Sequence, residues 1–133
     1  HPYRYLIKHK MLHAVMTAHI FNRNIDPDYP ATLSYKTLTE VLRNQLHFDG
    51  VILTDDMYMQ GIVDNYDIAE AIILAINAGA DILVMGNNIT TGYESERPFK
   101  VVDIIVNAVK QGKIPAYRLR QSYERIRKLK RRL

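Results

Sequence analysis

Three short runs of apolar residues recur along the chain, and each is followed by an amphipathic stretch. The runs lie near residues 14–19, 51–55 and 81–86. Continuous apolar runs of this length are typical of strands that are buried on both faces. Because parallel strands need long crossover connections, the alternation of strand and helix indicates parallel βαβ units. The predicted fold class is therefore α/β.

The stretches between and after these runs carry the signals of helices. Their apolar residues recur at three- and four-residue spacing, which is typical of a helix with one buried face. Glycine commonly follows the last turn of a helix, and proline suits the first turn. The signals are the N-cap candidate Ser34, the terminators Gly79 and Gly112, Pro98 in a first turn, a basic terminal helix over residues 116–132 that follows Pro115, and a weaker helix over residues 2–10.

The chain is short for a complete barrel. An eight-stranded βα barrel takes about 250 residues, whereas this chain has 133 residues and three predicted strands. A three-stranded parallel sheet leaves two edges and much apolar helix surface uncovered. We therefore expect residues 1–133 to form a single partial domain, either a fragment of a larger domain or a member of an obligate assembly.

Composition excludes several classes of protein. The chain is 47% hydrophobic and 24% charged, as in ordinary globular proteins, and no apolar run is long enough to span a membrane. It has no cysteine, which excludes disulfides and thiolate metal ligands. The histidines have no spacing with acids that suggests a metal site, and the motifs GxxxxGK and GxGxxG are absent. We therefore expect no metal and no cofactor.

The positive charge is concentrated at one end of the chain. The net charge is +4, and the segment from Arg118 onward has eight Lys or Arg residues against one acid, Glu124. A basic helix can contact nucleic acid or an anionic membrane surface. Its apolar residues keep helical spacing, however, and it lacks an aromatic or glycine-rich nucleic-acid motif. This pattern favours a docked terminal helix with a solvated basic face, and nucleic acid is the alternative partner.

Two adjacent acids, Asp55 and Asp56, follow the second apolar run. The carboxyl ends of strands in parallel α/β folds are where catalytic groups gather, so this pair is candidate chemistry. Two other interpretations of this acid pair remain open. An acid after a strand often caps the next helix, and paired acids also bind divalent cations.

The segment from Val41 to Met59, VLRNQLHFDGVILTDDMYM, resembles the nucleophile signature of glycoside hydrolase family 3. In that family, a helix ending in two aliphatic residues and a basic residue leads through an aromatic and glycine turn to an aliphatic strand, then Ser or Thr and Asp. The matching parts are Val41, Leu42 and Arg43, then Phe48 to Gly50, then Val51 to Leu53, then Thr54 and Asp55.

The resemblance extends over nearly the whole chain, in family order, and points to the bacterial β-N-acetylglucosaminidase (β-hexosaminidase) branch. One departure is Tyr58, where the family usually has a small residue. The further matching segments are VMTAHI at Val15 to Ile20, PATLS at Pro30 to Ser34, NAGADILVMGNN at Asn77 to Asn88, and GKIP and SYERIRKLK in the region of the closing helices.

The resemblance implies a fold and a reaction. The fold is the C-terminal portion, about three βα units, of a (β/α)8 TIM-type barrel with parallel strands and outer helices. The reaction is retaining hydrolysis of β-linked N-acetylglucosamine, in peptidoglycan-derived material. The family's acid/base, a histidine paired with an aspartate, lies upstream of the matched segment, so we expect the isolated chain to be inactive.

The resemblance also assigns roles to single residues. Consecutive strand residues point to opposite faces, so Asp55 and Asp56 are not expected to form the catalytic pair between themselves. The resemblance implies Asp55 as nucleophile, and Asp56 is then expected to support the site without touching the sugar. From its place after a strand, His19 is a candidate substrate contact, with a hydrogen-bonded structural role as the alternative. Met59 is a second candidate, with a core position as its alternative, and Asn87 and Asn88 are expected to be turn residues, with sugar contact as the alternative.

Three functional hypotheses follow from different classes. The first is the nucleophile-bearing part of such a glycosidase, with a carbohydrate substrate and with the remainder of the barrel as its structural partner. The second is an inactive remnant that associates with a second copy of the chain. The third is a nucleic-acid binder that uses the basic helix. No membrane partner is expected.

Overall fold

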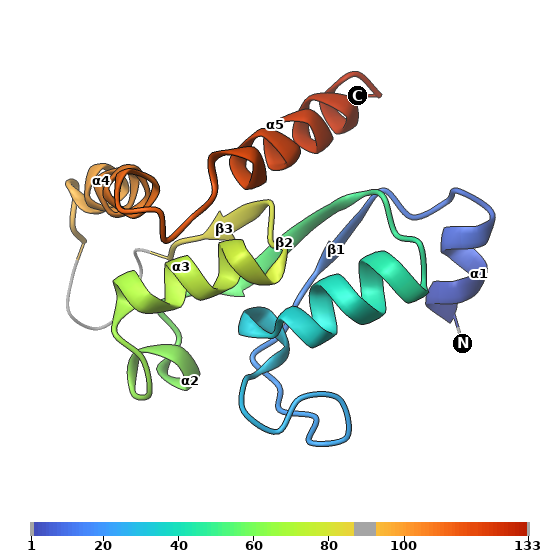
Figure 1. Cartoon of the computed structure of the whole chain (residues 1–133), viewed down its shortest axis with the longest axis horizontal. Coiled ribbons are helices and arrows are strands. Elements are labelled where there is room, and N and C mark those ends of the chain that lie inside the picture. Colours follow the sequence, from blue (N-terminus) through green and yellow to red (C-terminus); the bar gives the residue numbers. More distant parts are fainter. Residues whose placement is uncertain (1, 87–92, 133) are drawn as a thin grey trace.

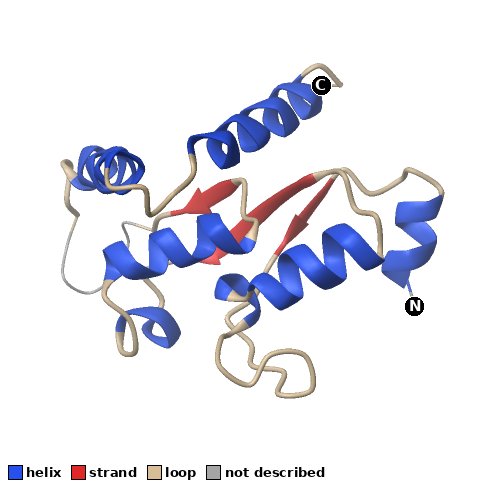
Figure 2. Cartoon of the chain, viewed as in Figure 1, coloured by secondary structure: helices blue, strands red, loops and turns tan. Residues whose placement is uncertain are grey.

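Three parallel strands alternate with helices in the computed structural model, which describes residues 2–86 and 93–132. The predicted α/β class is confirmed (Figures 1 and 2). The elements are α1 (Pro2–Lys8), β1 (Ala14–Met16), η1 (Ala31–Leu33), η2 (Lys36–Gln45), β2 (Val51–Asp56), α2 (Gln60–Val63), α3 (Ile68–Ala78), β3 (Ile82–Val84), α4 (Arg97–Lys110) and α5 (Ala116–Lys130).

The sheet has the order β1-β2-β3, and all of its carboxyl ends lie at one edge. Ala14 pairs with Val51, and Leu53 pairs with Ile82. The register then shifts, because Asp56 pairs with Val84, so that three residue steps of β2 face two steps of β3. Such an extra residue is a β-bulge. β1 and β3 are also shorter than the apolar runs that predicted them.

Helices cover one face of the sheet. Ile52 is fully buried against η2 and α3, and Val15 and Leu83 pack against the same cluster from the neighbouring strands. Met16 follows Val15 and therefore points to the opposite face, where it is 60% exposed. The sheet thus has a packed face and, at β1, an open one.

The helix ends follow the sequence signals. The Ser34 hydroxyl accepts a hydrogen bond from the Thr37 amide at 2.9 Å, so this residue caps the first turn of η2 as predicted. α3 is followed by Gly79 with φ of 127° and α4 by Gly112 with φ of 73°, the left-handed region that favours glycine. η2 is a π-helix over Lys36–Gln45, and directly after it the Leu46 amide donates to the Val41 carbonyl.

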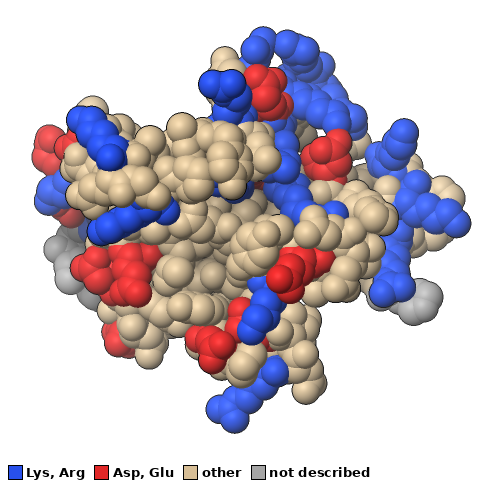
Figure 3. All heavy atoms as spheres, in the orientation of Figure 1, with Lys and Arg blue, Asp and Glu red and all other residues tan. Residues whose placement is uncertain are grey.

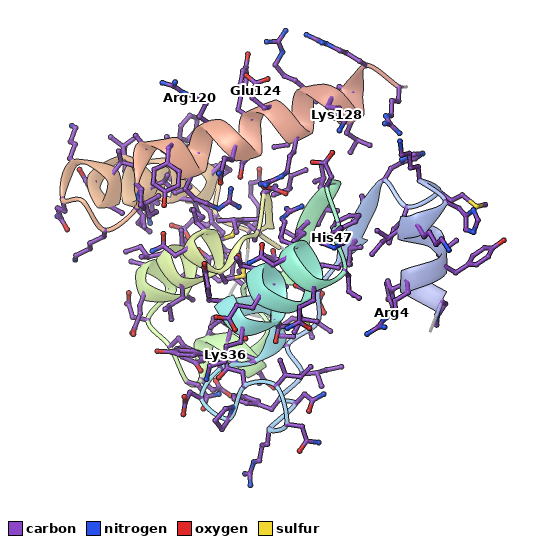
Figure 4. The ribbon with its side chains drawn as sticks, turned by 45° about the vertical axis from the view of Figure 1, so that its right-hand side comes forward. Arg4, Lys36, His47, Arg120, Glu124 and Lys128 are labelled. Atoms are coloured by element: carbon purple, nitrogen blue, oxygen red, sulfur yellow. The ribbon has the colours of Figure 1, made fainter. Side chains whose placement is uncertain are left out.

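The basic helix α5 is docked, but its cations are only partly solvated. Arg118 is 7% exposed and donates to the backbone carbonyls of Ile76 and Ala80. Figure 4 shows Arg120 and Glu124 on the side of α5 that faces away from the sheet, and Figure 3 shows blue cations gathered over this helix. The expectation of a solvated basic face therefore holds for only part of the helix. A membrane-spanning helix needs a long apolar stretch, and none of the helices in residues 2–86 and 93–132 contains one.

Candidate active site

Asp55 lies near the carboxyl end of β2, inside the bulged stretch between Leu53 and Asp56. Its side chain is half-buried. The Oδ1 atom accepts a hydrogen bond of 2.8 Å from the Asp56 amide. Among residues 2–86 and 93–132, this is the one hydrogen bond recorded for its carboxylate, and no cation lies within ion-pair distance of it. A carboxylate held in this way has an oxygen left for an electrophile.

Asp56 is bonded quite differently. Its Oδ1 accepts hydrogen bonds from the Gly86 amide at 2.7 Å and from the Tyr58 amide at 3.0 Å. A Cβ atom at residue 86 would overlap the carboxyl group of Asp56, so glycine is needed for this close approach. The carboxylate therefore joins the end of β2 to the segment that follows β3.

His19 follows β1 and has both ring nitrogens engaged within the protein. Its Nε2 lies 2.9 Å from the Asp56 carbonyl oxygen, and its Nδ1 lies 3.0 Å from the Thr32 hydroxyl. Because a carbonyl oxygen only accepts, Nε2 carries a proton. Thr32 is in turn 2.8 Å from the Thr17 hydroxyl. The sequence left His19 open between a sugar contact and a hydrogen-bonded structural group, and in the structure its ring connects the end of β1 to the end of β2.

Met59 is 46% exposed and precedes α2, and its amide donates to the Asp56 carbonyl. The neighbouring Tyr58 lies under Arg97, whose guanidinium carbon is 4.2 Å from the ring centroid. Arg97 is buried and donates to the Gly86 carbonyl at 2.6 Å. Sequence reasoning missed this residue, because an arginine directly before Pro98 in a first turn looks like a surface charge. Asn87 and Asn88 lie outside the described residues.

The ends of all three strands thus meet around Asp56 and Gly86, with His19 from β1 and Arg97 from α4. Among the described residues there is no group of three or more His, Cys, Asp or Glu side chains that could hold a metal ion. The chemistry available at these strand ends is that of the Asp55 carboxylate, next to an Asp56 carboxylate that is hydrogen-bonded to two backbone amides.

The sequence matches a known family over residues 1–129, described as the Glycosyl hydrolase family 3 N terminal domain. The chain belongs to glycosyl hydrolase family 3. Beta-hexosaminidase A of Pseudoalteromonas piscicida is 32% identical to it over 143 residues, a match that covers 99% of this chain and 24% of that protein. The resemblance inferred from the sequence is therefore confirmed.

Comparison with solved structures supports the same family. A family 3 beta-N-acetylglucosaminidase from Paenibacillus sp. str. FPU-7 is 34% identical, with a TM-score of 0.86, over 98% of this chain and 24% of that one. The beta-N-acetylglucosaminidase from Thermotoga maritima is 30% identical, with a TM-score of 0.82, over 96% and 27%. The chain is part of a TIM-type barrel fold, and it spans about a quarter of the length of these relatives.

Proposed function

We propose that this chain is the nucleophile-bearing part of a retaining β-N-acetylhexosaminidase and that Asp55 is the nucleophile. The observation that carries the proposal is the contrast between two adjacent acids. Asp56 accepts hydrogen bonds from the amides of Tyr58 and Gly86, whereas Asp55 accepts a single hydrogen bond, from the next amide. Similarity to family 3 β-hexosaminidases supports the reaction class.

The proposed reaction has two steps. An oxygen of the Asp55 carboxylate attacks the anomeric carbon as the glycosidic C–O bond breaks, and an acid/base group protonates the departing oxygen. The same group then removes a proton from water, which attacks the anomeric carbon and releases Asp55. Two inversions give net retention. The acid/base is proposed to come from outside residues 1–133.

The other residues at this edge are proposed to shape the site. His19 holds the Asp56 carbonyl, and this bond fixes the backbone beside Asp55. Met59, which is exposed at the start of α2, is proposed to contact the sugar. The proposed substrate is β-linked N-acetylglucosamine in material derived from peptidoglycan.

The domain is proposed to be the last three βα units of the barrel. The open face of the sheet at Met16 and the quarter-length match to the relatives support this assignment. The missing strands are proposed to come from the rest of the polypeptide, and a second copy of the chain is the competing source.

The test uses the polypeptide that carries residues 1–133, at its natural length, with 4-nitrophenyl N-acetyl-β-glucosaminide as substrate. Asp55→Ala should lower kcat at least about a thousandfold. Azide fits the space left by the carboxylate, so added azide should restore turnover and yield the α-glycosyl azide. Asp56→Ala is the matched control, because its loss is structural and azide should not restore it. Substantial activity in Asp55→Ala, or no azide product, would refute the role of Asp55.

A further inference from the structure

Two helices of this chain end in an unusual way. After α1, Lys10 has φ of 56°, and after η2, His47 has φ of 57°. The turn after α1 has the paired hydrogen bonds of a glycine-type helix end, from the Lys10 amide to Ile7 and from the Met11 amide to Leu6. A side chain in this conformation is strained, and glycine is the usual residue.

The other two left-handed residues among the described ones are glycines, Gly79 and Gly112. Lys10 and His47 are therefore exceptions within the chain itself. Both line the same cavity of about 280 Å³. Strained residues that persist where glycine would be more stable cluster at functional sites.

The cavity has an apolar floor and a cationic rim. Ile7 of α1, Leu12 before β1, Phe48 between η2 and β2, and Val51 at the start of β2 supply apolar surface. Charged and histidine side chains outnumber these apolar ones in the lining, which favours a charged ligand with a small apolar part. The rim cations are Lys10, Arg125, Lys128 and Arg132, with Asp49 as the one acid among the lining residues.

The rim has more positive than negative charge. Lys128 pairs with Asp49, and Arg125 contributes to the Asp81 cluster. Arg132 donates to the His13 Nδ1 atom at 2.9 Å, so that nitrogen acts as the acceptor. In the part of the chain that the structure describes, neither Lys10 nor Arg132 has an acid within 4.0 Å. Figure 4 labels His47, just after the end of η2, and Lys128, on α5, and both residues line the cavity.

We propose that this cavity binds a small organic anion, with a ring-sized apolar body on the floor and a phosphate or carboxylate head at Lys10 and Arg132. The cavity lies at the amino end of β2, beside Val51, whereas Asp55 lies near the carboxyl end. Four residue steps of a strand separate them by about 13 Å. The cavity is therefore distinct from the proposed sugar site.

The test measures binding of phenyl phosphate by calorimetry to the natural-length polypeptide, with inorganic phosphate and phenol as separate arms. Phenyl phosphate should bind more tightly than either, because it supplies both the head and the body. Lys10→Gly should weaken its binding about tenfold and should raise the melting temperature, because glycine relieves the left-handed strain. Affinity and stability should therefore change in opposite directions, which distinguishes a ligand-binding role of Lys10 from a structural role.

Two further variants complete the test. Lys10→Gln removes the charge without adding backbone freedom and should weaken binding to a similar extent. Lys8→Gln removes the same charge from an exposed position of α1 outside the cavity, and it should leave affinity unchanged. Absent binding of phenyl phosphate, equal binding of inorganic phosphate, or equal affinity in Lys10→Gly and the parent would overturn the proposal. Because none of these binding measurements requires catalytic turnover, their outcomes do not depend on the proposed role of Asp55.

Discussion

Replacement of Asp81 by asparagine should destabilise the fold more than any surface change. The Asp81 carboxylate, directly before β3, is fully buried. Three guanidinium groups surround it, with N–O distances of 2.6 Å to Arg43 and 3.2 Å to both Arg118 and Arg125. The Ser122 hydroxyl and the Ile52 amide also donate to it, at 2.8 and 3.0 Å. One acid therefore joins β2, β3, η2 and α5.

The size of the destabilisation follows from the cations that Asp81→Asn leaves without a counter-charge. Burial raises the pKa of Asp81, but the Ile52 amide and the nearby cations outweigh it and hold the pKa below its ordinary value. Burial also lowers the pKa of Arg43 to about 10, and the Asp81 charge opposes that shift. Without Asp81, three buried or half-buried cations repel one another. Removing one partner of a buried ion pair costs about 3–5 kcal/mol, a large part of a typical stability of about 5–15 kcal/mol.

Urea denaturation of Asp81→Asn and parent, followed by circular dichroism, measures this difference. Asp103→Asn is the matched control, because Asp103 is exposed on α4 and has no ion pair among the described residues. The control should change the free energy of unfolding by less than about 0.5 kcal/mol. A loss below about 1 kcal/mol for Asp81→Asn, or one equal to the control, would refute the argument that this carboxylate neutralises the cluster.

Stability should also depend on pH through Asp81. Its folded-state pKa is lowered, so its contribution is complete above the unfolded value of about 3.9 and is lost as the pH falls through the folded value. Unfolding curves of parent and Asp81→Asn should therefore converge only below about pH 4, and a constant difference down to pH 2 would contradict this. Gly86→Ala should displace the Asp56 carboxyl group and lower the free energy of unfolding by about 1–3 kcal/mol. Thermal denaturation measures this loss, and an unchanged melting temperature would show that the contact between Gly86 and Asp56 does not restrict residue 86. His19→Gln keeps a donor near the Nε2 position and should retain more activity and stability than His19→Asn, which keeps only the Nδ1 position, with a difference of about 1 kcal/mol. Equal behaviour of the two His19 variants would mean that the bond to the Asp56 carbonyl has no role.

Local patterns were sufficient for the strands and the longer helices, but they did not predict the short helices η1 and α2. The apolar runs predicted all three strands, and Ser34 and Gly79 marked helix ends, because burial of one face and capping are decided by residues a few positions apart. Strand lengths were less predictable. β1 ends at Met16, and His19 beyond it makes side-chain bonds to Thr32 and Asp56 that no periodicity encodes.

The sequence analysis did not predict the long-range polar contacts. Asp81 is 38 positions from Arg43 and 37 from Arg118, and in sequence it is only the first residue of an apolar run. Arg118 belongs to a basic segment that predicts a solvated face, yet it turns inward to the backbone carbonyls of Ile76 and Ala80. Arg97 was overlooked for the same reason. A charge run shows where cations are frequent, and only the packed fold shows which of them have buried acceptors.

The bulge in β2 explains why two adjacent acids have different surroundings. Asp56 returns to register with Val84, and its carboxylate reaches the amide of Gly86 two residues further on. Asp55 falls in the stretch with the extra residue, so its carboxylate accepts only from the next amide among the described residues. Bulges are frequent next to active sites, where the unpaired extra residue redirects a side chain. The extra residue thus allows two adjacent acids at one strand end to differ. The Asp56 carboxylate accepts hydrogen bonds from two backbone amides, whereas the Asp55 carboxylate accepts one and has an oxygen that accepts none among the described residues.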